Sequence, residues 1–217
     1  RKKFSQYSRA NMKIYFDGDS FTYGKRLVDP ANSRFSKLIA DHFNAEECNF
    51  SIGGASNQRI QRQLLIDNKI EEYDLAIIQM TFRSRFEYYD RIKRKFSLIN
   101  QAKTRKYKGQ KIFMNEEHRP FWQHYYEHIY DDEFGRVNEE IIFKSIKDHC
   151  AIMDVPLVIV TNDESSRLPF DYCMSWKKLP RALIIEDGHK KQSYHPNEEG
   201  HMLICEQIID IVNKKHN

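Results

Sequence analysis

Two continuous apolar runs constrain the fold of this chain more than any other feature of its sequence. Neither Leu75–Gln79 nor Pro156–Thr161 shows the alternation of apolar and polar residues that marks a strand with one solvent-facing side. Such runs are typical of parallel strands covered on both faces. Shorter segments of similar character bring the expected strands to five, the other three being Ile14–Phe16, Cys48–Ile52 and Ala182–Ile185.

Helical patterns separate these strands. Apolar residues recur at helical spacing in 34–43, in a segment opened by Ser56 or Asn57, in 134–153 and in 197–214. This alternation predicts an α/β domain, a three-layer α/β/α sandwich around a flavodoxin-like, parallel five-stranded sheet. We expect a single domain over 12–217 with a helical insertion at about 88–133, preceded by an extension over 1–11 that is not native or is disordered.

The formal net charge of +4 is spread unevenly along the chain. Residues 91–111 contain nine Lys or Arg and no Asp or Glu. Such a run can neutralise the phosphates of a nucleic acid or another polyanion. A solvated helical face is the simpler interpretation of the same run.

The sequence predicts a cytoplasmic protein without membrane contact. No run approaches the roughly 18 apolar residues of a spanning helix, and the basic, polar start of the chain has no apolar core of a secretory signal. The four cysteines are far apart and form no CxxC pair, which favours reduced thiols. His124 and His128 have the i, i+4 spacing of metal ligands but no accompanying HExxH-type carboxylate, so we expect no metal site. The oligomeric state stays open.

Three polar motifs are expected at one edge of the sheet, where the carboxyl ends of parallel strands meet. A serine hydroxyl needs an adjacent base to become a nucleophile. The oxyanion that forms on an attacked carbonyl needs fixed N–H donors, which a glycine turn can expose. The motifs supply these parts: Gly18-Asp19-Ser20 after the first strand, Gly53-Gly54 within 49–57 after the second, and His195-Pro196-Asn197 before the final helix.

These motifs resemble, in order, the sequence blocks of the SGNH (GDSL-like) hydrolase family, with Phe21 where the family often has Leu. The resemblance implies ester hydrolysis through an acyl-serine, without metal or cofactor. It implies that Ser20 is the nucleophile and His195 the general base. It also implies an oxyanion hole built from the backbone N–H groups of Ser20 and Gly54.

The chain departs from the family pattern at two positions. The family usually has its acid three residues before the His, and here that position is Gln192. Asp187, which is followed by Gly as in the family, is the expected third member of the triad across a longer loop. The family's third oxyanion donor is an Asn after the third strand; no Asn occurs in 79–87, where Thr81 or Ser84 can take its place.

The expected substrate is a small or carbohydrate ester with a short acyl group such as O-acetyl. Four polar residues that follow strands are candidates for binding it: Asp19, Asn57, Arg83 and Arg85. Aromatic residues further along can stack on a sugar ring, although core packing is the usual role of aromatics in a helix; they are Phe121, Trp122 and Tyr125.

Two alternatives remain open. Phe16-Asp17-Gly18-Asp19 also resembles the opening motif of the haloacid dehalogenase-like phosphatases, which implies Asp17 as nucleophile, Asp19 as acid/base and a required Mg²⁺. That interpretation leaves His195 and its flanking residues unexplained. A catalytically impaired SGNH scaffold that binds a glycan or polyanion is the other alternative, because a fold does not fix a function.

Overall fold

The computed structural model describes residues 12–99, 118–175, 177–186 and 189–216. The expected extension over 1–11 lies outside these residues. The central sheet has five parallel strands in the order β2-β1-β3-β6-β7. This arrangement confirms the predicted three-layer fold with a parallel five-stranded sheet. The strand bounds are β1 Lys13–Asp17, β2 Glu46–Asn49, β3 Leu75–Met80, β6 Leu157–Thr161 and β7 Tyr172–Cys173.

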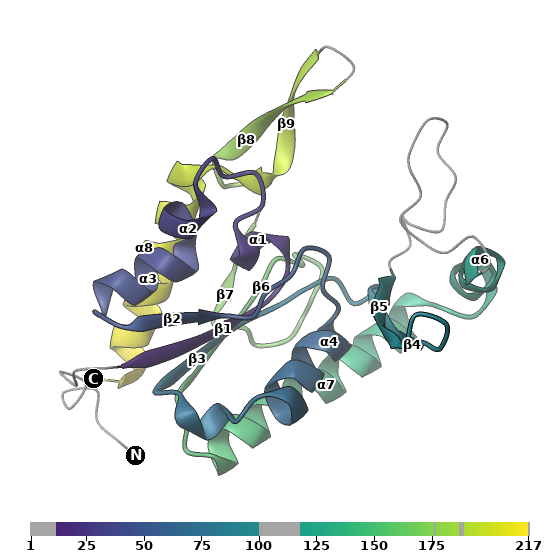
Figure 1. Cartoon of the computed structure of the whole chain (residues 1–217), viewed down its shortest axis with the longest axis horizontal. Helices are drawn as coiled ribbons and strands as arrows, with labels where there is room; N and C mark the ends of the chain where they lie inside the picture. Colours follow the sequence, from purple (N-terminus) through teal and green to yellow (C-terminus); the bar gives the residue numbers. More distant parts are fainter. Residues whose placement is uncertain (1–11, 100–117, 176, 187–188, 217) are drawn as a thin grey trace.

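Helices cover both faces of the sheet (Figure 1). One layer contains α2 (Pro30–Ser33), α3 (Phe35–His42) and α8 (Glu198–His216). The other contains α4 (Asn57–Arg62), which continues as a π-helical turn over Gln63–Asp67, and α7 (Asp132–Ile152). A 3-10 turn over Ile70–Glu72 leads into β3.

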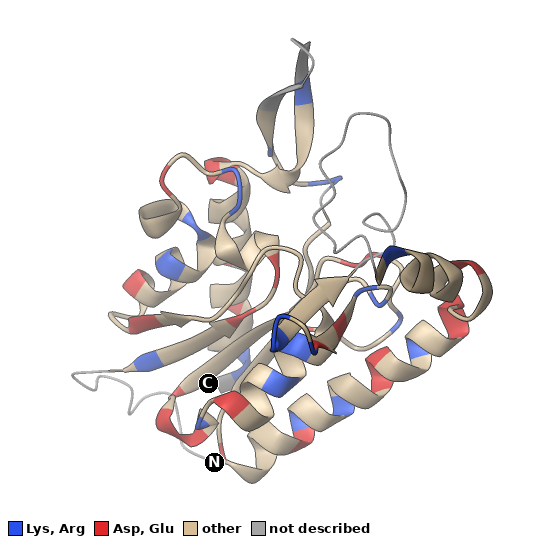
Figure 2. Ribbon diagram, turned by 45° about the vertical axis from the view of Figure 1, so that its right-hand side comes forward, with Lys and Arg blue, Asp and Glu red and all other residues tan. Residues whose placement is uncertain are grey.

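The long helix α7 carries Lys, Arg, Asp and Glu interspersed along its length (Figure 2). None of the helices in the described ranges has the length and apolar character needed to cross a membrane.

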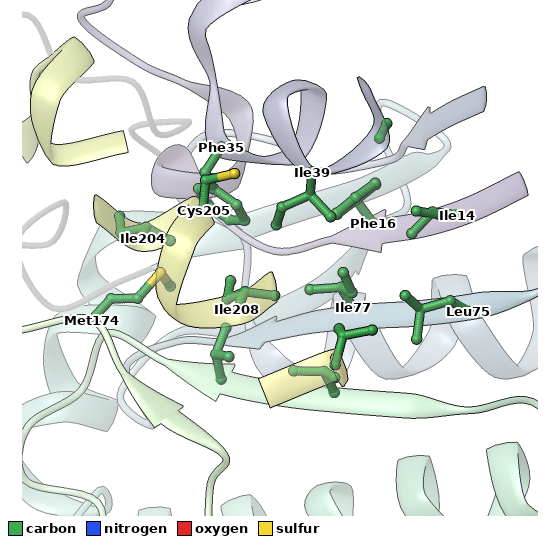
Figure 3. Packing of buried hydrophobic residues seen from close by; sticks show 14 of the residues in the cluster. Ile14, Phe16, Phe35, Ile39, Leu75, Ile77, Met174, Ile204, Cys205 and Ile208 are labelled. Carbon is green, nitrogen blue, oxygen red and sulfur yellow. The ribbon is translucent and has the colours of Figure 1, made fainter. Parts of the chain in front are cut away.

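The sheet separates two apolar cores, which explains the continuous apolar runs of the sequence. Side chains alternate along a strand, so Phe16 and Ile77 pack on the α3 and α8 side with Ile208 (Figure 3). Tyr15 and Ile78 pack on the α4 and α7 side. Every residue of β3 is buried because the strand has a core on each face.

The prediction that Ala182–Ile185 is the fifth strand of the central sheet is wrong. This segment belongs to β8 (Arg181–Glu186), which pairs antiparallel with β9 (His189–Pro196) in a separate two-stranded ribbon. The ribbon projects beyond α1 and α2 (Figure 1), and Leu183 is 66% exposed. A short apolar run has the same pattern in an exposed ribbon as in a buried strand, so the sequence did not separate the two cases.

The insertion expected to be helical at about 88–133 is only partly so. Residues 86–99 form an antiparallel hairpin of β4 (Phe86–Asp90) and β5 (Lys95–Ile99), and α6 (Arg119–His128) is a helix. Aromatic side chains from β4 and α6 pack together as a small third core, and aromatics favour strands. The Asp90 carboxylate also accepts the backbone N–H groups of Ile92 and Lys93, which closes the hairpin turn.

Candidate active site

The site begins where β1 ends, at the switch point of the sheet: the chain continues from β1 to β2 on one side and then to β3 on the other side of β1. Open α/β sheets bind their ligands at such a switch point. Gly18 is required there, since a Cβ at this position would lie 2.8 Å from the Gln79 Cβ. Asp19 then caps α1 (Ser20–Tyr23) by accepting the Phe21 backbone N–H at 2.9 Å. The cap fixes Ser20 as the first residue of the helical turn.

The structure brings Ser20 and His195 together from opposite ends of the chain. The Ser20 Oγ lies 3.0 Å from His195 Nε2. His195 stands near the end of β9, and its ring lies 5.8 Å from the ring of Phe21. Ser20 itself is only 7% exposed. A base at this distance can accept the serine proton directly.

Ser193, which the sequence analysis missed, occupies the other side of the imidazole. Its Oγ lies 3.0 Å from His195 Nδ1 and accepts the His195 backbone N–H at 3.1 Å. If Nε2 is to accept the Ser20 proton, Nδ1 must carry a hydrogen, which the Ser193 oxygen can accept. Gln192, at the family's usual acid position, instead accepts a hydrogen bond from Arg181. Asp187 lies outside the described residues.

The environment of His195 keeps its imidazole neutral. Burial, and then the positive charge of Lys25, lower the pKa of His195 to about 4. Asp19 opposes this shift, while Arg26 and Arg85 add to it. A neutral imidazole is the form that can act as a general base near pH 7.

Two backbone N–H groups, expected from the sequence to form an oxyanion hole, have no acceptor within the described part of the chain. They belong to Ser20 and Gly54. The loop of Gly54 is tied to the end of β1 by a 3.3 Å hydrogen bond from the Ile52 N–H to the Gly18 carbonyl. Gly54 has φ +80°, and no atom lies within 4 Å of where its Cβ would stand. The turn therefore needs glycine for its backbone and is open on that side.

Asp19, expected to bind substrate, is instead fully buried at the centre of a hydrogen-bond network. Burial alone would raise the pKa of its carboxyl, but the Arg85 guanidinium and several hydrogen bonds outweigh it and lower the pKa. The network joins the carboxyl ends of β1, β3 and β6. Its donors are the Phe21 N–H, Gln79 Nε2 at 2.7 Å, Thr81 Oγ1 at 2.9 Å, Arg85 Nη1 at 2.6 Å and Asn162 Nδ2 at 3.0 Å.

The two side chains considered for the third oxyanion donor differ in their surroundings. Thr81 is fully buried; its hydroxyl donates to Asp19 and accepts from Arg85. Ser84 is partly exposed, and its carbonyl accepts the Tyr126 hydroxyl at 2.6 Å. The Thr81 hydroxyl proton is thus already committed to a carboxylate.

The remaining candidate substrate ligands lie in different places. Asn57 is buried, with its amide exchanging hydrogen bonds of 2.9 and 2.8 Å with the backbone of Thr81. Arg85 lies at the site, 15% exposed, and also donates to the Ala55 carbonyl at 3.3 Å. Arg83 turns away toward Ser165, whose Oγ it reaches at 3.2 Å.

The carboxylate of Asp17 is buried in an ion pair with Arg59. Its other hydrogen bonds come from the Gly18 N–H and the Tyr15 hydroxyl. Both aspartates of the phosphatase-like motif are therefore paired with arginines, Asp17 with Arg59 and Asp19 with Arg85. Within the described ranges, no group of three or more His, Cys, Asp or Glu side chains is arranged to hold a metal ion.

Comparison with known proteins shows that this chain is similar in fold to solved structures of low sequence identity. No family model and no curated protein sequence matches the chain. Among solved structures, a carbohydrate esterase whose active site displays divergent catalytic and non-catalytic binding functions is 10% identical, with 93% of this chain and 68% of that chain covered and a TM-score of 0.50. At this identity the likeness establishes the three-layer fold alone.

Two further solved structures align over most of this chain at lower TM-scores. The psychrotrophic esterase EstA from Pseudoalteromonas sp. is 11% identical, with 95% of this chain and 98% of that chain covered and a TM-score of 0.49. A two-domain esterase active on acetylated mannans is 15% identical, with 95% of this chain and 51% of that chain covered and a TM-score of 0.43.

Proposed function

We propose that this protein is a serine-dependent ester hydrolase resembling the SGNH class, with Ser20 as nucleophile and His195 as general base. The observation that supports this most strongly is the 3.0 Å contact between Ser20 Oγ and His195 Nε2. The neutral imidazole and the free N–H groups of Ser20 and Gly54 supply the other parts that acyl transfer requires.

In this mechanism Ser20 Oγ attacks the ester carbonyl carbon while its proton passes to His195 Nε2. The carbonyl oxygen becomes an oxyanion, held by the N–H groups of Ser20 and Gly54. Collapse of the tetrahedral intermediate breaks the bond to the alcohol, which leaves with the proton from Nε2. Water then attacks the acyl-serine with the same imidazole as base, releasing the acid and restoring Ser20.

The particular reaction we propose is removal of a short acyl group, such as O-acetyl, from a carbohydrate. A cleft of about 360 Å³ between the β4–β5 hairpin and α6 has a lining that suits a carbohydrate, although it shares no lining residue with the Ser20–His195 site. Tyr88 and Trp122 line it with ring centroids 5.1 Å apart, and Phe121 is 61% exposed at its edge. Aromatic faces with nearby polar groups such as His118 suit a sugar ring, which has apolar faces and a polar edge.

Labelling with a small fluorophosphonate tests the nucleophile directly. We expect one covalent adduct on the wild type by intact mass, none on Ser20→Ala, and wild-type labelling of Ser145→Ala, a control serine on α7. An adduct that persists on Ser20→Ala would refute the assignment.

No adduct on the wild type would also count against the proposal. The alternatives would then be tested through Mg²⁺-dependent phosphatase activity with an Asp17→Asn control, and through binding of acetylated glycans without turnover.

A further inference from the structure

Two cationic residues, Lys25 and Arg26, follow helix α1 and contact no reacting atom in the mechanism above. The one-turn helix α1 is capped at its C-terminus by Gly24, and the Lys25 backbone N–H donates to the Ser20 carbonyl at 2.9 Å. Lys25 and Arg26 therefore stand one turn beyond Ser20, on the loop that leads to α2. Figure 2 shows basic residues on this loop and on the β8–β9 ribbon above it.

These two cations differ from the arginines beneath them because the residues that the structure describes offer them no anionic partner. Arg59 and Arg85 are neutralised by Asp17 and Asp19. Lys25 and Arg26 are both exposed, and within the described part of the chain no carboxylate pairs with either side chain. Arg26 also has φ +80°, a conformation that side-chain-bearing residues rarely adopt. The loop thus holds two charges beside the site that no carboxylate of the described residues pairs with, despite an unfavourable backbone.

The loop that carries the two cations lies on the His195 side of the site. The Val28 backbone N–H, two residues beyond Arg26, donates to Glu198 Oε1 at 3.2 Å, and Glu198 lies three residues after His195. In the proposed reaction His195 returns its proton to the departing alcohol, and both cations also act electrostatically on this imidazole. The Gly54 turn, by contrast, comes from the loop after β2 and would hold the carbonyl oxygen. A negative group attracted by the two cations would therefore belong to the alcohol part of the ester and not to the acyl part.

We propose that Lys25 and Arg26 form an anion subsite that selects esters whose alcohol part carries a carboxylate or phosphate group. The inference rests on the proposed function and narrows its substrate class to acyl esters of anionic alcohols, including acidic or phosphorylated sugars. Attraction of such an alcohol also steers the substrate toward the site at low ionic strength.

Matched phenyl acetates test this selectivity. The probes are 3-acetoxybenzoate and 3-acetoxyphenyl phosphate, with neutral 3-acetoxybenzamide as reference. We expect kcat/KM for an anionic probe, relative to the neutral one, to fall about tenfold in the Lys25→Gln/Arg26→Asn double variant, because each exposed charge pair contributes at most about fivefold. Asn is chosen at 26 because it tolerates a positive φ. The anionic probe whose relative kcat/KM falls more in the double variant shows whether carboxylate or phosphate is the preferred group.

Lys69→Gln is the matched control, because Lys69 is exposed and precedes β3 at the opposite edge of the sheet. Its anionic-to-neutral ratio should equal that of the wild type. An unchanged ratio in the double variant, or an equal fall in Lys69→Gln, would overturn the subsite.

A binding measurement separates this inference from the proposed catalytic function. Ser20→Ala cannot turn over an ester through Ser20, so its affinity for each probe can be followed by NMR titration. The subsite predicts tighter binding of an anionic probe than of the neutral amide, and loss of that difference when Lys25 and Arg26 are also replaced. Equal affinity for anionic and neutral probes would refute the subsite even if wild-type esterase activity is found. Selective binding without turnover in the wild type would retain the subsite and refute the esterase.

Discussion

Ser193 Oγ lies 3.0 Å from His195 Nδ1, on the side of the imidazole opposite Ser20. A hydroxyl in this position can hold the ring and its tautomer, although it cannot stabilise an imidazolium as a carboxylate does. The described geometry is thus a serine–histidine pair oriented by a second serine. The acid role predicted for Asp187 stays a prediction.

Ser193→Ala should lower kcat about tenfold with little change in KM, because one orienting hydrogen bond is lost and the substrate is not contacted. Gln192→Ala is the control, since its side chain contacts Arg181 and not the imidazole. Steady-state kinetics of both variants and of Asp187→Asn show which substitution lowers kcat most. A larger loss in Asp187→Asn than in Ser193→Ala would assign the orienting role to the carboxylate.

Gly54→Ala should reduce kcat far more than it reduces stability. Alanine at φ +80° costs about 1–2 kcal/mol in backbone strain, and relief of that strain would turn the N–H away from the oxyanion. Loss of one such donor typically costs roughly 10²–10³ in rate. Gly53→Ala is a close control, because its Cβ also meets nothing within 4 Å and its φ is not positive. Equal kinetic effects in the two variants would exclude Gly54 from the oxyanion site.

The pH profile of kcat/KM should keep its acid limb near pH 4, since burial and Lys25 lower the pKa of His195 to about 4. An unperturbed histidine would give a limb near 6.5. Lys25→Gln should move the limb to higher pH, because a positive neighbour that disfavours the imidazolium is removed. A limb that stays in place in Lys25→Gln would show that Lys25 does not contribute to this pKa.

Stability should fall as the pH drops from about 6.5 to about 4, with His201 as one cause. His201 is buried, and its Nδ1 accepts the Phe35 N–H at 3.1 Å. Burial lowers the pKa of His201 to about 4. The unfolded chain binds a proton in this window that the folded chain does not, so the full contribution, roughly 3 kcal/mol, is present above pH 6.5 and lost toward pH 4. Urea unfolding of His201→Asn should show a flatter pH dependence, whereas exposed His42→Asn should follow the wild type.

Asp19→Asn should destabilise the fold by about 3–5 kcal/mol, because it leaves the Arg85 guanidinium beside the site without its anion. The expected readout is a lower urea midpoint with an unchanged m-value. Asp41→Asn, at an exposed i, i+4 pair with Lys37, should cost less than about 1 kcal/mol. Similar costs for both variants would mean that the buried network contributes little.

The fold was predictable where burial on both faces leaves a pattern in the sequence. Leu75–Gln79 reads as a covered strand because apolar residues are needed toward both cores, and β3 confirms it. The hairpin at 86–99 was not predicted, because its aromatics pack against α6, more than twenty residues later in the chain. Ala182–Ile185 was wrongly predicted as a strand of the central sheet, because no local feature of the sequence distinguishes pairing with β9 from pairing within that sheet.

At the site, residue type and order placed Ser20 and His195 at one sheet edge, and the structure brings them into contact. Asp19 and Asn57 were expected to face a ligand. Their burial follows from contacts with Gln79, Thr81 and Arg85, which only the tertiary arrangement sets. Ser193 had no motif to mark it, because its role depends on the geometry of β9.

The nucleophile and the base belong to parts of the molecule that are held with very different strength. Ser20 is anchored to the central sheet, whereas His195 belongs to a two-stranded ribbon that projects from it, and isolated ribbons are marginal in water. The ribbon can therefore detach by local opening at a free energy well below that of global unfolding. Mild heating should abolish turnover reversibly while the circular dichroism of the helices is still native, and amide exchange in β9 should outpace exchange in β3.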